Sequence, residues 1–460
     1  MTYSRAYFHH LMVGTGEVLG RSRNLIQSRN KNLSLHLMIS SLAIFTIKFL
    51  IILNLQFGAW LGADGESYID YAKKISEYGL FAKGIIYWPA GYPVIIWLSE
   101  FFSRYESFFI LTILQTVFFS LSVWFLAKNL MTTKIKSVTL YVFYFISLNP
   151  TLALTSISIG YESICASCLI LFIAYFLRDF RHVGELSYSR NLLFASLLAG
   201  LASSMQPRLI PGFLISISIW VYFKFKQISF KILVYRLFVS FIIFSLLPTG
   251  LIMRNYIAEQ SPVLSTNLGV NMVIGAGPNA SGSYGNGSSN VECGDLPTAE
   301  MELDRARTRC ALNWYLKNPS KFFELSVSKS TALWSPWWGP LAAGTMARNP
   351  YLNFHPVRSL ITTQDQLNVV IGPLGKGFAW LLILGNWLLM ILGFRKLLKL
   401  GLEEKILAYF TASAILGTWL VTLITFGDHR FRLPIMPLSL LLAVVGLFSF
   451  KKNRFDSPSR

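Results

Sequence analysis

The stretch LHLMISSLAIFTIKFLIILNLQF, residues 35–57, decides the fold class of the chain. It is apolar for longer than the roughly 20 residues that a helix needs to cross the hydrocarbon core of a bilayer. Lys48 lies inside it, and a lysine in that setting is expected to face other helices or to extend its amine toward the membrane surface. The stretch therefore predicts a membrane-spanning helix.

Further apolar runs of the same kind follow along the chain. Together with the first they predict an all-α polytopic membrane protein with about ten transmembrane helices. The further runs lie near 107–127, 137–156, 159–177, 191–207, 210–223, 232–252, 377–393, 406–425 and 434–450.

The composition excludes the other broad classes of protein. Charged residues make up 14% of the 460-residue chain, whereas soluble globular proteins carry roughly 25%. The net charge of +19 would fit nucleic-acid binding only if the basic residues were gathered on one soluble face. They instead form short clusters between apolar runs, as topological anchors do, so no nucleic-acid partner is expected.

The basic clusters also predict an orientation. If the N-terminus is cytosolic, each segment placed inside is basic, and the alternation ends with both termini in the cytosol. We expect the inner (plasma) membrane of a bacterium. The predicted divisions are a cytosolic tail at 1–34, an N-terminal membrane domain at 35–253 with a first extracytoplasmic loop at 58–106, a large extracytoplasmic loop at 254–375, C-terminal membrane helices at 376–450 and a cytosolic tail at 451–460.

The first outer loop places two carboxylates, Asp64 and Glu66, directly after the first span. Apolar residues at helical spacing predict an interfacial helix from about Ser67 to Tyr78, and Pro89 is expected to begin a second amphipathic helix. Asp64 could cap the first of these helices. It could equally act as a general base toward an acceptor hydroxyl, and the two roles are compatible.

The four cysteines fall into two pairs. Cys293 and Cys310 lie in the large outer loop, where an oxidising compartment would favour a disulfide between them. Cys165 and Cys168 lie inside an apolar run, and without a preceding strand or a second Cys/His pair their spacing does not indicate a redox or zinc site.

Four segments resemble one family. Asp64 after a first span, the stretch Tyr68–Ala72 and WPAGYP at 88–93 look like the first external loop of the GT-C glycosyltransferases, in particular the bacterial relatives of dolichyl-phosphate-mannose protein mannosyltransferases and of the aminoarabinose transferase of lipid A. The other three segments that resemble the family are RNYIAEQSPVLSTNLGVNMVIGAGPNASGSYG at 254–285, ALNWYLKNPSKFFELSVSKSTALW at 311–334 and HRFRLPIMPLSLLLA at 429–443.

The resemblance implies a GT-C-like fold with interfacial helices in both outer loops, and it implies that the acidic residue at position 64, with Glu66 beside it, is catalytic. Arginine suits a lipid phosphate because its guanidinium pairs two oxygens at fixed geometry. Arginines near span ends also anchor helices at lipid headgroups, and Glu162 near a helix start also stabilises that helix. The candidate substrate-binding residues are Tyr68, Lys83, Tyr92, Glu162, Arg208, Arg254, Asn267, Asn271, His429, Arg430 and Arg432.

These features together predict an inverting transfer of a sugar from an undecaprenyl- or dolichyl-phosphate carrier to an extracytoplasmic glycan, lipid or protein acceptor, with Asp64 as the general base. No cofactor and no divalent metal are expected. Two alternatives remain open: a flippase or transporter for lipid-linked sugars, and a polymerase or ligase that moves whole oligosaccharides. The sugar, the acceptor and the oligomeric state are not indicated by the sequence.

Overall fold

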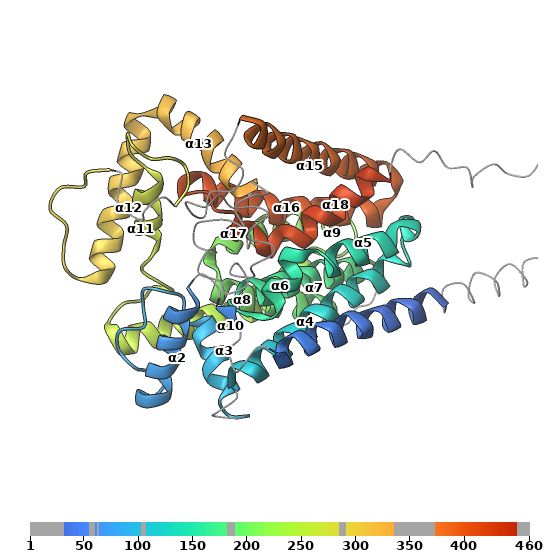
Figure 1. Ribbon diagram of the computed structural model, residues 1–460, viewed down its shortest axis with the longest axis horizontal. Helices are drawn as coiled ribbons and strands as arrows, with labels where there is room; N and C mark the ends of the chain where they lie inside the picture. Colours follow the sequence, from blue (N-terminus) through green and yellow to red (C-terminus); the bar gives the residue numbers. More distant parts are fainter. Residues whose placement is uncertain are drawn as a thin grey trace, which may run out of the picture.

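The structure is a computed structural model that describes residues 32–54, 60–61, 64–102, 107–181, 189–284, 291–334 and 373–448. Most of these residues are helical, and the elongated helices lie side by side in a bundle (Figure 1). The predicted cytosolic tails at 1–34 and 451–460 lie almost wholly outside the described residues, as does 335–372 of the large loop.

The bundle is built from the predicted apolar runs, each of which contains helix. Its helices are Asn32–Asn54, α4 (Ser107–Leu130), η1 (Lys136–Val138) with α5 (Thr139–Ser147), α6 (Pro150–Ser156), α7 (Glu162–Arg181), α8 (Arg190–Met205), η2 (Pro207–Leu209) with α9 (Ile210–Lys224), α10 (Phe230–Glu259), α15 (Pro373–Leu400), α16 (Leu402–Ile424), and α17 (His429–Arg432) with η5 (Leu433–Ile435) and α18 (Met436–Leu447).

The prediction of about ten spans is not confirmed by the described residues. Among the described residues seven helices are long and apolar enough to cross a membrane, or up to eight if the bent pair at 136–156 is one span. That pair bends by 59° where Pro150 begins a new helix, which Asn149 caps by accepting a hydrogen bond from the amide of Leu152. The helices α8 and α9 have only 16 and 15 residues, because Pro207 ends the run between them.

The helix α7 lies at the centre of the bundle. Of the 18 most apolar consecutive residues of α7, 83% are buried inside the protein, against 17% for the same length of the first helix, Asn32–Asn54. Its side chains are buried around its whole circumference, Cys165 and Cys168 among them as free thiols. The residue at the start of α7 is therefore placed at the centre of one end of the bundle.

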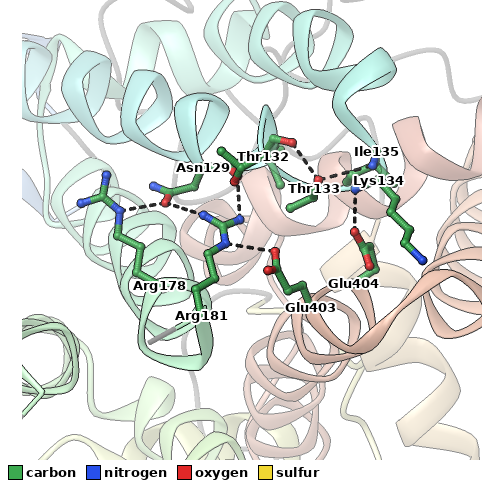
Figure 2. Close-up of polar contacts among 10 residues, drawn as sticks. Asn129, Thr132, Thr133, Lys134, Ile135, Arg178, Arg181, Glu403 and Glu404 are labelled. Carbon is green, nitrogen blue, oxygen red and sulfur yellow. Dashed lines mark hydrogen bonds and ion pairs between the residues drawn. The ribbon is translucent and has the colours of Figure 1, made fainter. Parts of the chain in front are cut away.

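At the other end of the bundle the basic segments meet. Arg181 donates to the Glu403 carboxylate at 3.0 Å and to the carbonyl of Asn129 at 2.9 Å, and the Glu404 carboxylate accepts from the backbone amide of Lys134 at 2.6 Å (Figure 2). These contacts join α4, α7 and α16. We call this the basic end; it contains segments that the charge pattern predicts to face the cytosol.

The elements of the two predicted outer loops gather at the opposite end, on the left of Figure 1. The first loop forms β1 (Trp60–Leu61), α2 (Gly65–Tyr78) and α3 (Gly91–Ser99), so the helix predicted at 67–78 and the one predicted from Pro89 are both present. The large loop forms α11 (Leu268–Gly275), α12 (Glu300–Lys317) and α13 (Pro319–Trp334), and the last two meet at Asn318 and Pro319, inside the segment 311–334 that resembles the family.

Two details of the large loop differ from or add to the sequence analysis. Its predicted first residue, Arg254, lies inside α10, which continues to Glu259. Cys293 and Cys310 form a disulfide that joins the segment before α12 to α12 itself. A small separate core, which includes Met272 and Tyr315, holds α11 against α12.

The two ends of the bundle are expected to lie on opposite sides of the membrane. Glu66 is exposed on α2, and Lys405 is exposed at the basic end on α16, so a cysteine at either position should be reachable by a thiol reagent. The two variants are Glu66→Cys and Lys405→Cys. A membrane-impermeant maleimide added to intact cells should label the first variant, and should label the second only after permeabilisation. The four native cysteines give a low background, because two are buried and two are paired. Labelling of both variants from one side would contradict the orientation.

Candidate active site

A short parallel ladder brings two distant carboxylates to one place. In this ladder β1 pairs with β2 (Ser158–Ile159), with Leu61 opposite Ile159. Asp64 follows Leu61 by the same number of residues as Glu162 follows Ile159. Because paired parallel strands run in the same direction, the residues that follow them leave the ladder at the same end. Asp64 then precedes α2, and Glu162 begins α7.

Arg430 lies between these two carboxylates. It belongs to the one-turn helix α17, whose first turn is capped by Asp428: the Asp428 carboxylate accepts from the amide of Arg430 at 2.9 Å. The Arg430 guanidinium donates through Nε to Glu162 and through Nη1 to Asp64. Its Nη2 donates to the hydroxyl of Tyr68 at 3.2 Å. One buried cation thus joins α2, α7 and α17.

The three charged side chains differ in how far solvent reaches them. Arg430 and Glu162 expose 4% and 3% of their side chains, whereas Asp64 exposes 18%. Asp64 is therefore the carboxylate of this set that a substrate can reach, and Glu162 is a buried counter-charge. The difference agrees with the sequence analysis in setting Asp64, the predicted base, apart from Glu162.

The side chain of Asp64 does not cap a helix. Asp64 stands at the N-cap position of α2, but its side chain makes no capping hydrogen bond. Only its carbonyl contributes to the helix, by accepting from the amide of Tyr68 at 3.1 Å. The side chain instead pairs with Arg430. Of the two interpretations of Asp64, the capping role does not apply, and the carboxylate is available for chemistry.

Aromatic rings and two glutamines hold the site in place. The ring of Tyr68 packs edge-on against those of Tyr92 and Tyr161, with centroids 5.5 and 5.9 Å away. Gln206 donates to the Tyr161 hydroxyl at 2.7 Å, and the Tyr92 hydroxyl donates to Gln115 at 2.8 Å. Burial raises the pKa of Tyr68 well above its ordinary value, so this phenol keeps its proton at neutral pH.

Sequence reasoning missed Gln115, Tyr161 and Gln206. Gln115 also donates to the carbonyl of Ser158, which fixes the strand before Glu162. A signal was present for one of them, since Gln115 is a polar amide inside an apolar span, where polar side chains are costly and are commonly functional. Tyr161 and Gln206 lie at the ends of apolar runs, where polar residues are ordinary, so nothing singles them out.

Beside Arg430 lies a group of buried nitrogen donors that have no acceptor among the described residues. These atoms are Nη1 of Arg208 and Nε of Arg432. His429 lies beside them; its Nδ1 faces the Asp428 carboxylate at 3.1 Å, so in a neutral ring its Nε2, also without a partner among the described residues, is an acceptor. The Arg208 guanidinium stacks on the ring of Phe431 at 3.4 Å, and burial lowers the pKa of Arg208 to about 10, which still leaves it charged at neutral pH. Arg432 donates through Nη1 to the carbonyl of Trp334 at 2.7 Å.

Unsatisfied buried donors are expensive, at about 1–3 kcal/mol each and more when they are charged. Arginine side chains that cluster in spite of this cost indicate a place where an anion binds, because an anion would accept from several of them at once. We call Arg208 and Arg432 the cationic cluster. It lies next to Arg430, which its two carboxylates already neutralise.

Other predicted site residues lie away from this set or are occupied by the protein itself. Glu66 and Lys83 are exposed, and Glu66 is on a different face of α2 from Asp64 and Tyr68. Arg254 donates to the carbonyls of Leu80, Ala82 and Ile85, so its observed role is to hold the turn of the first loop. Its expected phosphate contact stays a prediction.

The two asparagines of the large loop belong to the start of α11. Asn267 is its N-cap residue and accepts from the Ser265 hydroxyl at 3.1 Å, and the amide of Asn271 donates to the carbonyl of Asn267. Contacts of their side chains with a substrate stay predictions. Where the structure is described, no group of three or more His, Cys, Asp and Glu side chains is placed to hold a metal ion, and Arg430 supplies the positive charge between the carboxylates.

Comparison of the chain with protein-family models, with curated proteins and with solved structures gave no match. The assignment of function therefore depends on the residues and geometry of the site.

The pairing of Arg430 with both carboxylates is expected to be essential for stability. Glu162→Gln keeps the volume but removes one of the two negative charges that neutralise a buried guanidinium. Removing one partner of a buried ion pair costs about 3–5 kcal/mol, so the midpoint of thermal unfolding in detergent should fall clearly. Glu324→Gln breaks the more exposed pair with Lys321 and should cost less than about 1 kcal/mol. Equal losses in the two variants would contradict the role of Glu162.

Proposed function

We propose that the protein is a glycosyltransferase that moves a sugar from a polyprenyl-phosphate carrier to an acceptor hydroxyl outside the cytosol. The observation that carries the proposal is the juxtaposition of a reachable carboxylate, Asp64, with a buried cationic cluster that has unpaired donors. A carboxylate beside an anion site is what such a transfer needs: one group to take a proton and another to stabilise a departing phosphate. The residue pattern of both outer loops supports the same family of reactions.

Asp64 is the proposed general base. Its Oδ2 receives the hydrogen bond from Arg430, so we assign Oδ1 to the acceptor hydroxyl. As the acceptor oxygen attacks the anomeric carbon, its proton passes to Asp64, the bond from that carbon to the phosphate oxygen breaks, and the electron pair stays with the lipid phosphate. Attack from the face opposite the phosphate inverts the anomeric configuration. Arg430 holds the carboxylate in position for this step, and the Tyr68 hydroxyl accepts from Arg430 and so helps to orient the guanidinium.

The cationic cluster is the proposed site for the carrier phosphate. Arg430 is a weak candidate for that role, because Glu162 and Asp64 already balance its charge. Arg208 and Arg432 have no carboxylate partner among their described contacts, and each keeps a nitrogen without an acceptor there. A phosphate placed among them would satisfy these nitrogens and would be stabilised as its negative charge grows during transfer.

The arrangement favours catalysis over transport. Transporters of lipid-linked substrates are expected to bind near the membrane midplane, between repeated halves that contain broken helices. Here the reactive groups lie at one end of the bundle, at the mouth of α7 and next to the outer helices α2 and α13. A polymerase or ligase would use the same phosphate chemistry, and the length of the product distinguishes it from a transferase of single sugars.

Asp64→Asn is expected to reduce transfer by about 10²–10⁴-fold, the contribution of a positioned general base. The measurement is transfer of radiolabelled sugar from polyprenyl-phosphate sugar to membrane acceptors, with product mass read in parallel. Asp70→Asn makes the same change on an exposed face of the same helix and should leave transfer unchanged. Full transfer by Asp64→Asn would remove Asp64 from the chemistry. Equal movement of lipid-linked sugar across liposomes by wild type and Asp64→Asn would favour the flippase.

Arg208→Gln and Arg432→Gln are expected to weaken the use of the donor. Each removes a guanidinium from the proposed phosphate site, and one hydrogen bond to a charged group contributes about 1.5–3 kcal/mol, or roughly 10–150-fold in kcat/KM for the donor. Steady-state kinetics with varied polyprenyl-phosphate sugar give this ratio. Arg305→Gln, at an exposed position of α12, is the matched control. Unchanged kcat/KM in both cluster variants would place the phosphate elsewhere.

A further inference from the structure

Lys329 is a buried lysine that the proposed reaction does not use. It lies on α13 with none of its surface exposed. Its amine donates to the hydroxyl of Tyr315 at 2.7 Å and to the carbonyl of Leu423 at 2.8 Å. The Tyr315 hydroxyl donates in turn to the carbonyl of Ile424 at 3.2 Å. Lys329 and Tyr315 thus bind the last carbonyls of α16, which otherwise have no partner within their own helix.

The turn that follows α16 leads to Arg430 and is clamped against α13. The amide of Gly427 donates to the carbonyl of Gly282 at 2.8 Å. A Cβ atom at Gly427 would lie 2.1 Å from the carbonyl oxygen of Lys329, so only glycine allows this approach. Further along, the Arg432 guanidinium binds the carbonyl of Trp334 at the end of α13. The large outer loop therefore holds the chain on both sides of Arg430.

The hydrogen bonds of Lys329 fit a neutral amine. An uncharged amine has two protons, and the structure shows two acceptors, the Tyr315 hydroxyl and the Leu423 carbonyl. An ammonium group has a third proton, for which the described residues show no acceptor. Burial lowers the pKa of Lys329 from its ordinary value of 10.5 to about 7. The hydrogen-bond geometry and the burial of Lys329 thus both favour the neutral amine.

Tyr315 is the titratable group in direct contact with Lys329. Within the described residues no close carboxylate offsets the lowering of the Lys329 pKa by burial. Lys321 and Glu324 on α13 pair with each other, and the charged residues of α16 lie at the basic end. The remaining charged or titratable groups on the elements packed around Lys329 are Tyr409 on α16, Tyr284 and Asp428 in the adjoining turns, His429, Arg430 and Arg432 on α17, and Glu300, Glu302, Asp304, Arg305, Arg307, Arg309 and Lys317 on α12.

We propose that Lys329 is a positioning residue for Arg430: as a neutral amine it ties α13 to the end of α16 and fixes the turn 425–428, and protonation releases that turn. The role in transfer rests on the proposed function, whereas the effect on the turn does not. Arg430 orients Asp64, so release of the turn lowers the rate of transfer at saturating substrate more than it changes the binding of the donor. The protein then becomes less active as the pH outside the cytosol falls.

The sign of the stability change follows from linkage. Between about pH 7 and the ordinary pKa of 10.5 the unfolded or locally opened chain binds a proton on Lys329 that the folded chain does not. Stability of the turn therefore rises with pH in this window, and opening of the turn increases by up to about tenfold for each unit that the pH falls from 9 toward 7. Below pH 7 both states carry the proton, and the dependence levels off.

Hydrogen–deuterium exchange of full-length protein in detergent tests the release of the turn without any transfer assay. Peptides that cover 423–432 are followed from pH 6 to 9, with rates corrected for intrinsic exchange. Wild type should lose protection as the pH falls from 9 to 7, and Lys329→Met, which is permanently neutral, should not. Lys321→Met, at a half-buried position on the first turn of the same helix, should behave as wild type. Equal pH dependence in wild type and Lys329→Met overturns the proposal.

Transfer kinetics test the consequence for the site. Wild type should show an acid limb in kcat near pH 7 with little change in KM for the donor, and Lys329→Met should lack that limb. If wild type and Lys329→Met show the same pH dependence of exchange while wild type still transfers sugar, the role of Lys329 is overturned and the proposed function is not. An exchange difference in proteins that transfer no sugar would support the control of the turn by Lys329 and overturn the proposed function.

Discussion

The pairing of Arg430 with Asp64 and Glu162 is the interaction on which the rest of the structure depends. Its partners come from chain segments far apart, with Arg430 and Asp64 separated by 366 positions. A guanidinium that exposes only 4% of its side chain needs nearby negative charge. Because its two carboxylates belong to the start of α7 and to the residue before α2, the same contact closes one end of the helical bundle and builds a polar site there.

The cations at this end differ in what they can do. Arg430 is neutralised by protein carboxylates and is suited to hold Asp64 in one orientation. Arg208 and Arg432 are buried by aromatic rings and retain nitrogens without a protein acceptor among the described residues. Such donors reduce the stability of the folded chain, and their presence is best explained by an anion that binds there. Under the proposed function, this division would place proton transfer and phosphate binding side by side.

The large outer loop takes part in this arrangement by holding the turn before Arg430. Lys329 and Tyr315 bind the end of α16, Gly427 lets the turn approach α13, and Arg432 binds the end of α13. The disulfide between Cys293 and Cys310 and the small core between α11 and α12 stabilise the loop itself. Through these contacts a change in the protonation of Lys329, as proposed, would reach the charged site.

The sequence by itself indicated the membrane class, the helical runs and the helix near 67–78, because hydropathy and helical periodicity are local properties of the chain. The helices at 311–334 were expected from the family resemblance, and the outer position of both loops stays a prediction. The sequence also pointed to Asp64, Glu162, Arg208 and Arg430 as candidates. Only the tertiary structure decided that Asp64 is reachable while Glu162 is a counter-charge, that Arg254 holds a turn, and that Glu66 lies on another face. The two-residue ladder before Asp64 and Glu162 is too short to leave a pattern in the sequence. Which charges pair depends on where distant segments meet, and no local pattern encodes that.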